Sequence, residues 1–91
     1  TAHYLMEKAV VIRNKCGLHT RPSALIANAA SKFQEDVGIK KEGVEGWLNA
    51  KSVLGIISLE GCFGDKIIVS SEKEEAISTI INLFEVKFGE E

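Results

Sequence analysis

One histidine and one arginine stand two residues apart, immediately before a segment rich in helix-forming residues. Residues 17–24 read Gly-Leu-His-Thr-Arg-Pro-Ser-Ala, and residues 25–30 continue with Leu-Ile-Ala-Asn-Ala-Ala. Proline is favoured in the first helical turn, where its missing N–H would have had no partner. Pro22 therefore predicts a helix that begins beside His19.

This placement gives His19 and Arg21 a chemical role in common. The first backbone N–H groups of a helix are unpaired and carry partial positive charge, which attracts anions and phosphate in particular. The guanidinium of Arg21 adds a planar cation suited to phosphate oxygens. A histidine of ordinary pKa, about 6.5, is largely neutral in a cell, so a ring nitrogen can attack phosphorus. The pattern predicts a histidine that accepts a phosphoryl group inside a phosphate site.

Other interpretations of the same residues are weaker. A lone histidine near a helix start is usually a surface or capping residue. Here Gly17 permits a tight turn before the helix, and each neighbour adds a separate cue for the same anion site. Cys16 and His19 could instead belong to a thiol enzyme or to half of a metal site, but their closeness is weak evidence, and Cys62 has no histidine near it in the sequence. We expect no metal and no cofactor.

Length and composition fit one small globular domain, residues 1–91. The chain is 45% hydrophobic and 26% charged, and no apolar run approaches the roughly 18 residues that cross a bilayer. We therefore expect no membrane insertion. Two cysteines without a disulfide pattern indicate reduced thiols and a cytoplasmic location. Residues 1–5 are expected to fray or to be a cloning remnant, and His3 is assigned no role.

Charge is distributed unevenly along the chain. Residues 1–51 carry eight Lys/Arg and five Asp/Glu, whereas residues 52–91 carry three and eight, for a net charge of −2. This surplus is too small for nucleic-acid binding, which usually needs a strongly basic domain. The basic half, which contains His19, could still steer an acidic protein partner.

Hydrophobic patterns predict alternating strands and helices. β-Branched residues 8–12 indicate a strand, followed by a helix over residues 20–32. Strands at 37–40 and 46–49 should form a hairpin that turns near residues 42–43. A short helix is expected over residues 52–59, ended by Gly61, and then a strand over 66–70. The expected core contacts of the first helix are Leu25, Ile26, Ala29 and Phe33.

The last element should be a helix with one apolar face. Ser71 and Glu74 match a capping box, in which serine and glutamate satisfy unpaired N–H groups. The helix should then run to about Phe88. Its apolar face would consist of Ile77, Ile80, Ile81, Phe84 and Phe88. The resulting order is β-α-β-β-α-β-α, with the helices packed on one face of a small sheet.

A second informative segment surrounds Ser52. Residues 51–59 read Lys-Ser-Val-Leu-Gly-Ile-Ile-Ser-Leu. Serine is a preferred N-cap, and a capping role needs no further function. A phosphate on Ser52 would nevertheless be stabilised by the start of the short helix, and its charge would oppose the docking of acidic partner surfaces. Among the apolar residues that follow, Val53, Ile56 and Ile57 could all be buried.

Together these two segments resemble one known family. Residues 17–22 resemble the active-site motif of HPr, the histidine-containing phosphocarrier of the bacterial phosphoenolpyruvate:sugar phosphotransferase system. Residues 51–59 are similar to the regulatory serine motif of the same family, and the resemblance spans about residues 6–88. It implies an α+β open-faced β-sandwich, with a four-stranded antiparallel sheet and three helices on one face. Such a protein is a phosphocarrier rather than an enzyme.

The resemblance also implies roles for particular residues. His19 would be phosphorylated on Nδ1 by phosphorylated enzyme I, with Thr20 and Arg21 binding the phosphate, and would pass the group to IIA domains of sugar permeases. Ser52 would be phosphorylated by an ATP-dependent HPr kinase/phosphorylase, and the product could bind a catabolite-repression regulator. The implied partner-docking residues are Thr20, Arg21, Ala24, Leu54 and Ile57.

Three departures and two alternatives stay open. Cys16 stands where the family usually has a small polar residue, residues 41–46 form a slightly longer segment, and Gly46 replaces a common polar residue. The chain could instead be a carrier of the nitrogen-related phosphotransferase branch. It could also be a mainly regulatory HPr-like interaction module, although such paralogues lack the active-site histidine that this chain keeps.

Overall fold

The structure of the protein is a computed structural model, and residues 6–90 are the ones it describes. Residues 1–5, for which fraying was expected, lie outside this range, as does His3. Four antiparallel strands form one sheet in the order β1-β4-β2-β3. They are β1 (Met6–Val11), β2 (Val37–Lys41), β3 (Leu48–Asn49) and β4 (Lys66–Ser71). Strand β4 lies between β1 and β2 and pairs with both.

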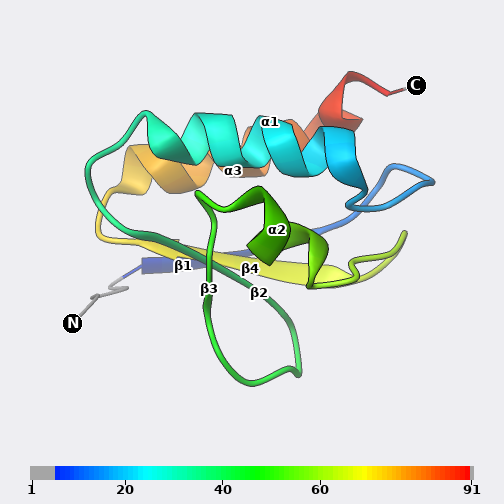
Figure 1. The fold of residues 1–91 in the computed structure, drawn as a ribbon, viewed down its shortest axis with the longest axis horizontal. Coiled ribbons are helices and arrows are strands. Elements are labelled where there is room, and N and C mark those ends of the chain that lie inside the picture. The colour runs from blue at the N-terminus through cyan, green and yellow to red at the C-terminus, as the bar shows by residue number, and fades with distance from the viewer. Residues whose placement is uncertain (1–5, 91) are drawn as a thin grey trace.

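Three helices cover this sheet. They are α1 (Thr20–Ser31), α2 (Val53–Ile57) and α3 (Glu74–Glu85), and a short 3₁₀ turn, η1 (Lys87–Gly89), follows the last. Figure 1 shows α1 and α3 side by side over one face of the sheet, with α2 next to α1 on the same side. The element order and the open-faced α+β sandwich therefore confirm the prediction. Within residues 6–90, no helix is both long and apolar enough to cross a membrane.

The core lies between the helices and the sheet, because both elements turn an apolar face to the same layer. On α1, Ile26 and Ala29 are buried as predicted, while Leu25 and Phe33 are partly buried against the same core. Burying a large aliphatic or aromatic side chain stabilises a fold by about 1.5–3 kcal/mol. The largest fully buried aliphatic and aromatic side chains are Ile12, Ile26, Val37, Ile39, Ile56, Ile67, Val69, Ile77, Ile80 and Phe84.

Two element boundaries differ from the prediction in the middle of the chain. Strand β3 contains only residues 48–49 instead of 46–49, because Gly43 (φ 87°) and Gly46 (φ 95°) turn the intervening loop away from the sheet. Helix α2 ends at Ile57, and Gly61 does not terminate it. The residue with left-handed backbone there is Glu60 (φ 53°), one position earlier.

The last helix differs at both ends. The predicted capping box is absent: α3 begins after Lys73 without a side-chain cap, and Ser71 belongs to β4. The Ser71 hydroxyl donates to the carbonyl of Asp36 (2.8 Å) and accepts from the N–H of Lys73 (3.1 Å). At the other end α3 stops at Glu85 rather than Phe88, because Lys87, Phe88 and Gly89 have φ of 56°, 55° and 75°.

Phe88 nevertheless joins the apolar face as predicted. Its side chain is buried and packs edge-on against Phe84, with ring centroids 4.9 Å apart. Ile77 and Ile80 are buried too, whereas Ile81 is partly buried. The hydrophobic face was therefore correct, although the backbone that presents its last member is not helical.

Two loops, residues 12–19 and 58–65, lie against each other at one end of the sheet. The N–H of Leu18 donates to the carbonyl of Gly61 (3.0 Å), and Ile12 exchanges hydrogen bonds with the second loop at Gly64 and Asp65 (2.9 Å each). Gly17 has φ of 70°, and a Cβ at this position would collide with the carbonyl oxygen of Gly61. A Cβ at Gly61 would in turn approach Ile12 Cδ1 at 2.8 Å. Glycine is therefore required at position 17, whereas a side chain at position 61 would have to displace the ends of the Ile12 and Leu18 side chains.

We expect Gly17→Ala to destabilise the fold more than Gly43→Ala. Both glycines have left-handed backbone, which costs about 1–2 kcal/mol in alanine. Only at Gly17 does the new methyl group also strike neighbouring backbone, since nothing lies within 4 Å of a Cβ at Gly43. Overpacking of this kind adds about 1–3 kcal/mol. Urea unfolding of both variants measures the difference, and equal destabilisation would show that the two loops separate at little cost.

Asp65 closes the turn that leads from the second loop into β4. Its carboxylate accepts from the N–H of Cys62 (2.9 Å) and lies 3.4 Å from Lys41 Nζ. The hydrogen bond from Cys62, helped by Lys41, holds the pKa of Asp65 below its usual range, against a partial rise from burial. Asp65 therefore stabilises the fold in its ionised form.

This lowered pKa predicts a specific pH dependence of stability. Because the pKa is lower in the folded chain than in the unfolded chain, the stabilisation by Asp65 is complete above the usual aspartate pKa of about 3.9. It is lost as the pH falls through the lowered value. Wild type should exceed Asp65→Asn in stability near neutrality, and the two should converge in acid when followed by urea unfolding.

Glu42→Gln provides the matched control for this experiment. Glu42 is exposed and lies 3.8 Å from Lys66, an exposed pair of a kind worth little. It should therefore change stability less than Asp65→Asn near neutrality. A stability difference between wild type and Asp65→Asn that stays constant from neutral to acid pH would contradict the role assigned to the carboxylate.

Candidate functional site

His19 is the N-cap of α1, as the sequence predicted for the helix start. Its backbone is extended (φ −78°, ψ −169°), and its side chain is 42% exposed. The first hydrogen bond of the helix runs from the N–H of Ser23 to the carbonyl of His19 (3.1 Å). Thr20 and Arg21 precede that bond, and Pro22 has no N–H, so two first-turn amides have no acceptor inside the helix. His19 thus stands beside two backbone donors and the positive end of a helix of twelve residues.

Three polar contacts fix the backbone that carries His19. The Asn14 side-chain amide donates to the carbonyl of Gly17 (2.8 Å), and the N–H of Gly17 donates to the carbonyl of Asn14 (3.1 Å). The buried hydroxyl of Ser23 donates to the carbonyl of Leu18 (3.2 Å). Since Leu18 itself is buried, the residue before His19 is anchored while the imidazole stays accessible.

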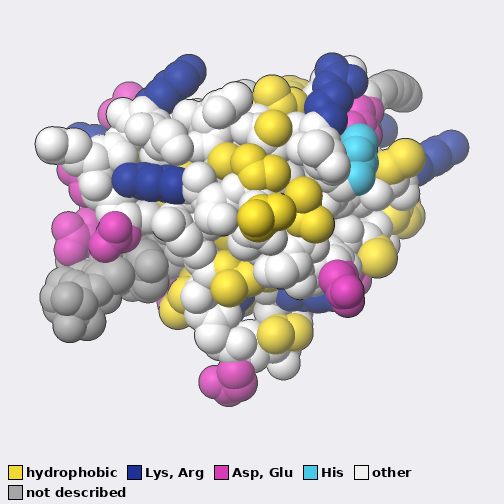
Figure 2. All heavy atoms as spheres, viewed as in Figure 1, with side chains coloured by type: hydrophobic (Ala, Val, Ile, Leu, Met, Phe, Trp, Pro, Cys, Tyr) yellow, Lys and Arg dark blue, Asp and Glu magenta, His cyan; other side chains and the backbone are white. Residues whose placement is uncertain are grey.

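Other predicted residues lie on the surface formed by α1 and α2. Thr20 and Arg21 are exposed and Ala24 is half-buried on α1. On α2, Leu54 is 78% exposed and Ile57 is half-buried. The two helices contact each other, and Figure 2 shows hydrophobic side chains gathered beside the histidine, with Lys/Arg and Asp/Glu side chains close to it. The structure thus brings apolar surface next to His19.

The three apolar residues after Ser52 that could all have been core residues differ in their burial. Ile56 is fully buried, while Val53 and Ile57 are partly buried. This follows because only one side of the five-residue helix α2 faces the core. Ser52 itself is the N-cap, as predicted: its hydroxyl oxygen accepts a hydrogen bond from the N–H of Gly55 (3.0 Å). The hydroxyl is half-buried and on the protein surface.

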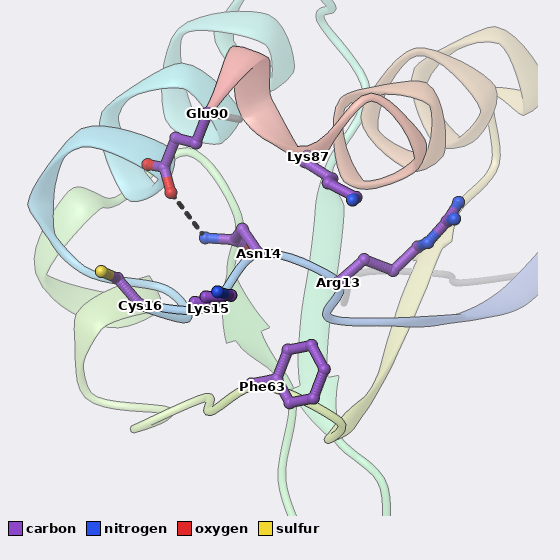
Figure 3. Close-up of a pocket in the computed structure, with 7 residues that line it drawn as sticks. All are labelled: Arg13, Asn14, Lys15, Cys16, Phe63, Lys87 and Glu90. Carbon is purple, nitrogen blue, oxygen red and sulfur yellow. Dashed lines mark hydrogen bonds between the residues drawn. The ribbon is translucent and has the colours of Figure 1, made fainter.

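An open pocket of about 380 Å³ lies next to this site. Figure 3 shows residues from three separate segments around it: the loop before α1, the loop before β4 and the end of the chain. Its lining residues are Arg13, Asn14, Lys15, Cys16, Phe63, Lys87 and Glu90. Three of these carry positive charge, so the surroundings of the pocket favour anionic groups.

Glu90 reaches from the pocket to the histidine. One carboxylate oxygen accepts from the Asn14 side-chain amide (3.1 Å), and the other lies 2.9 Å from His19 Nε2. Both hydrogens of the Asn14 amide are thereby used, and its oxygen is buried without a hydrogen-bond partner among the described residues. Sequence reasoning missed Asn14 and Glu90. No local pattern pairs residues 71 positions apart.

The thiol and metal interpretations gain no support from these residues. Cys16 and Cys62 are both exposed free cysteines. Within residues 6–90, no group of three or more His, Cys, Asp or Glu side chains could hold a metal ion. Cys16 is one of the residues that line the pocket, and it is exposed.

Comparison with known proteins identifies the family. The model of the family described as "PTS HPr component phosphorylation site" matches residues 6–86. The chain belongs to the HPr family. HPr proteins are phosphocarriers of the phosphotransferase system, so the predicted family, fold and carrier class are confirmed. The individual site residues stay predictions, because the match assigns none of them a role.

Individual HPr-family relatives cover nearly the whole chain. The phosphocarrier protein HPr of Treponema pallidum is 36% identical over 96% of this chain and 100% of its own length. The HPr-like protein Crh of Halalkalibacterium halodurans and the phosphocarrier protein NPr of Proteus mirabilis are each 34% identical, covering 89% and 92% of this chain and 98% and 96% of their own. The crystal structure of HPr from Thermoanaerobacter tengcongensis has a TM-score of 0.86 and 42% identity, over 96% of this chain and 99% of that one.

Proposed function

We propose that this HPr-family chain accepts a phosphoryl group on Nδ1 of His19 from phosphorylated enzyme I and passes it to IIA domains of sugar permeases. Phosphoenolpyruvate would be the ultimate source of the group. The observation that carries the proposal is the position of His19: an accessible imidazole at the N-cap of α1, directly before two free first-turn amides and Arg21.

The chemistry needs few groups. The lone pair of Nδ1 attacks phosphorus, a P–N bond forms, and the bond between phosphorus and the donor breaks. The amides of Thr20 and Arg21, with the Arg21 guanidinium, would donate hydrogen bonds to the phosphoryl oxygens. Because His19 and Arg21 are exposed, the group is held at the surface and can leave again for the next acceptor.

Partner proteins would dock on the surface around His19. Leu54 is an exposed leucine on α2, and Thr20, Arg21, Ala24 and Ile57 supply the remaining predicted contacts. An apolar centre with a charged rim is the usual composition of such an interface. We place the exchange in the cytoplasm, which the two free cysteines suit.

The direct test is phosphorylation by enzyme I and phosphoenolpyruvate, followed by phosphorus NMR. Wild type should give an acid-labile phosphohistidine signal, and His19→Ala should give none, because the acceptor nitrogen is gone. His3→Ala removes the other histidine of the sequence and is the matched control, with labelling equal to wild type. A wild type without phosphohistidine would exclude the carrier function.

Ser52 would regulate the carrier as the substrate of an ATP-dependent HPr kinase/phosphorylase. The Ser52 hydroxyl oxygen already accepts from Gly55, so a phosphate on that oxygen can keep the cap while adding negative charge. Its Lys51 neighbour donates to the carbonyl of Phe33 (2.8 Å), which keeps that ammonium occupied by backbone. The added charge would therefore act mainly on a partner that approaches α1 and α2, and a catabolite-repression regulator could recognise the modified form.

Ser52→Asp should accept the phosphoryl group from enzyme I about tenfold more slowly than wild type, because a negative charge would repel acidic partner surfaces. Ser52→Asn is the matched control: asparagine caps a helix as well as aspartate but is neutral, so its rate should stay near that of wild type. Single-turnover transfer measures both rates. Equal rates for Ser52→Asp and wild type would contradict the inhibitory role.

A second candidate is the nitrogen-related branch of the same system. Relatives named HPr, Crh and NPr match this chain at similar identity. Retention of His19 favours a carrier over a mainly regulatory module, and the serine segment favours the sugar branch. Transfer rates from the enzyme I of each branch would discriminate, since a carrier should be charged faster by its own donor.

A further inference from the structure

The carboxylate of Glu90 occupies the side of the imidazole opposite to the proposed phosphoryl acceptor. Its Oε2 lies 2.9 Å from Nε2 of His19, and its Oε1 accepts from the side-chain amide of Asn14 at 3.1 Å. The Glu90 side chain is 20% exposed, compared with 42% for the imidazole. The hydrogen bond from Asn14 holds the carboxylate beside the ring.

The backbone before Glu90 explains how the chain end reaches this site. Lys87, Phe88 and Gly89 all adopt left-handed backbone, which non-glycine residues visit rarely and seldom in succession. Burial of the Phe88 side chain against Phe84 offsets the cost of this conformation. The left-handed residues end α3 and change the path of the backbone, and the N–H of Glu90 donates to the carbonyl of Lys87 (2.9 Å).

The contact determines which ring nitrogen is free. An ionised carboxylate has no proton to donate, so Nε2 must carry the hydrogen in this bond. In a neutral imidazole the lone pair then resides on Nδ1. We propose that Glu90 is a positioning residue for phosphoryl transfer: it holds the His19 ring in the tautomer and orientation that present Nδ1 to phosphorus. This inference rests on the proposed function of His19.

The same carboxylate would act on the product. When Nδ1 bonds to phosphorus and the donor's bond breaks, the ring retains its Nε2 proton and becomes cationic. A carboxylate at hydrogen-bond distance stabilises that cation without taking its proton, as the aspartate of a Ser-His-Asp triad does for its histidine. On transfer to the acceptor, the P–N bond breaks and its electron pair returns to Nδ1. No proton has to leave or enter the site in either direction.

Two variants separate orientation from charge. Glu90→Ala removes the acceptor, and Glu90→Gln keeps an acceptor oxygen but not the negative charge. Glu85→Gln, an exposed glutamate at the end of α3, is the matched control. Because Glu85 is exposed and Glu90 lies beyond the last buried apolar side chain, Phe88, all three variants should fold, which urea unfolding verifies.

Nitrogen NMR of the unphosphorylated protein gives a readout that needs no enzyme I. At an alkaline pH that leaves the imidazole uncharged, wild type and Glu85→Gln should show a slowly exchanging proton on Nε2 and an unprotonated Nδ1. Glu90→Ala should lose the Nε2 proton signal to exchange with water, and Glu90→Gln should retain it. A wild type with the proton on Nδ1 would overturn the proposal, whatever the outcome of phosphorylation.

Single-turnover phosphorylation then tests the consequence for transfer. We expect Glu90→Ala to react about tenfold more slowly than wild type at saturating enzyme I, with Glu90→Gln between them, since a hydrogen bond to a charged group is worth more than one to a neutral group. Phosphorus–nitrogen coupling should place the phosphoryl group on Nδ1. Phosphate on Nε2 of wild type, or unchanged rates in Glu90→Ala, would refute the positioning role. A wild type that is not phosphorylated at all would refute the proposed function instead.

Discussion

The close approach of Gly17 to Gly61 is the constraint on which the site depends. A side chain at Gly17 would strike the carbonyl oxygen of Gly61, so glycine there lets the loop that precedes α1 lie directly on the loop that precedes β4. The hydrogen bond between Leu18 and Gly61 then fixes the residue next to His19, while the buried Leu18 side chain anchors it to the core. The backbone next to His19 is thus fixed, while the imidazole stays accessible. This combination of fixed backbone and accessible side chain suits the phosphoryl acceptor proposed for His19.

Short stretches of sequence correctly predicted those features of the fold that depend on neighbouring residues. Pro22 marked the start of α1, because the first turn tolerates a missing N–H. The apolar spacing of α3 identified its buried face, and Ser52 was correctly placed as an N-cap. Helix starts and amphipathic faces can be read from a few neighbouring residues, which is why these predictions held. The residues that surround His19 from elsewhere in the chain carried no such signal.

Where the prediction was wrong, long-range packing outweighed a local pattern. Ser71 fitted a capping box, but its backbone pairs with Met6 on one side and Val37 on the other, so β4 extends through it. Phe88 fitted the helical spacing of α3, yet it enters the core through a left-handed turn. The energy of a buried aromatic side chain exceeds that of one more helical turn. Sequence spacing could therefore identify what Phe88 contacts but not the path of the backbone.

The path of the backbone at residues 87–89 matters for the chemistry, because it places Glu90 beside the His19 ring. A carrier must hold its phosphoryl group tightly enough to keep it and loosely enough to release it. In the proposed carrier, the first-turn amides of α1 would donate to the phosphoryl group on Nδ1, while the Glu90 carboxylate contacts Nε2. The amides favour the anionic phosphoryl group, whereas the carboxylate favours the cationic ring that carries it. Because the His19 side chain stays 42% exposed, both groups would stabilise the charged intermediate without enclosing the ring. Burying the same groups would strengthen each interaction and slow the departure of the phosphoryl group.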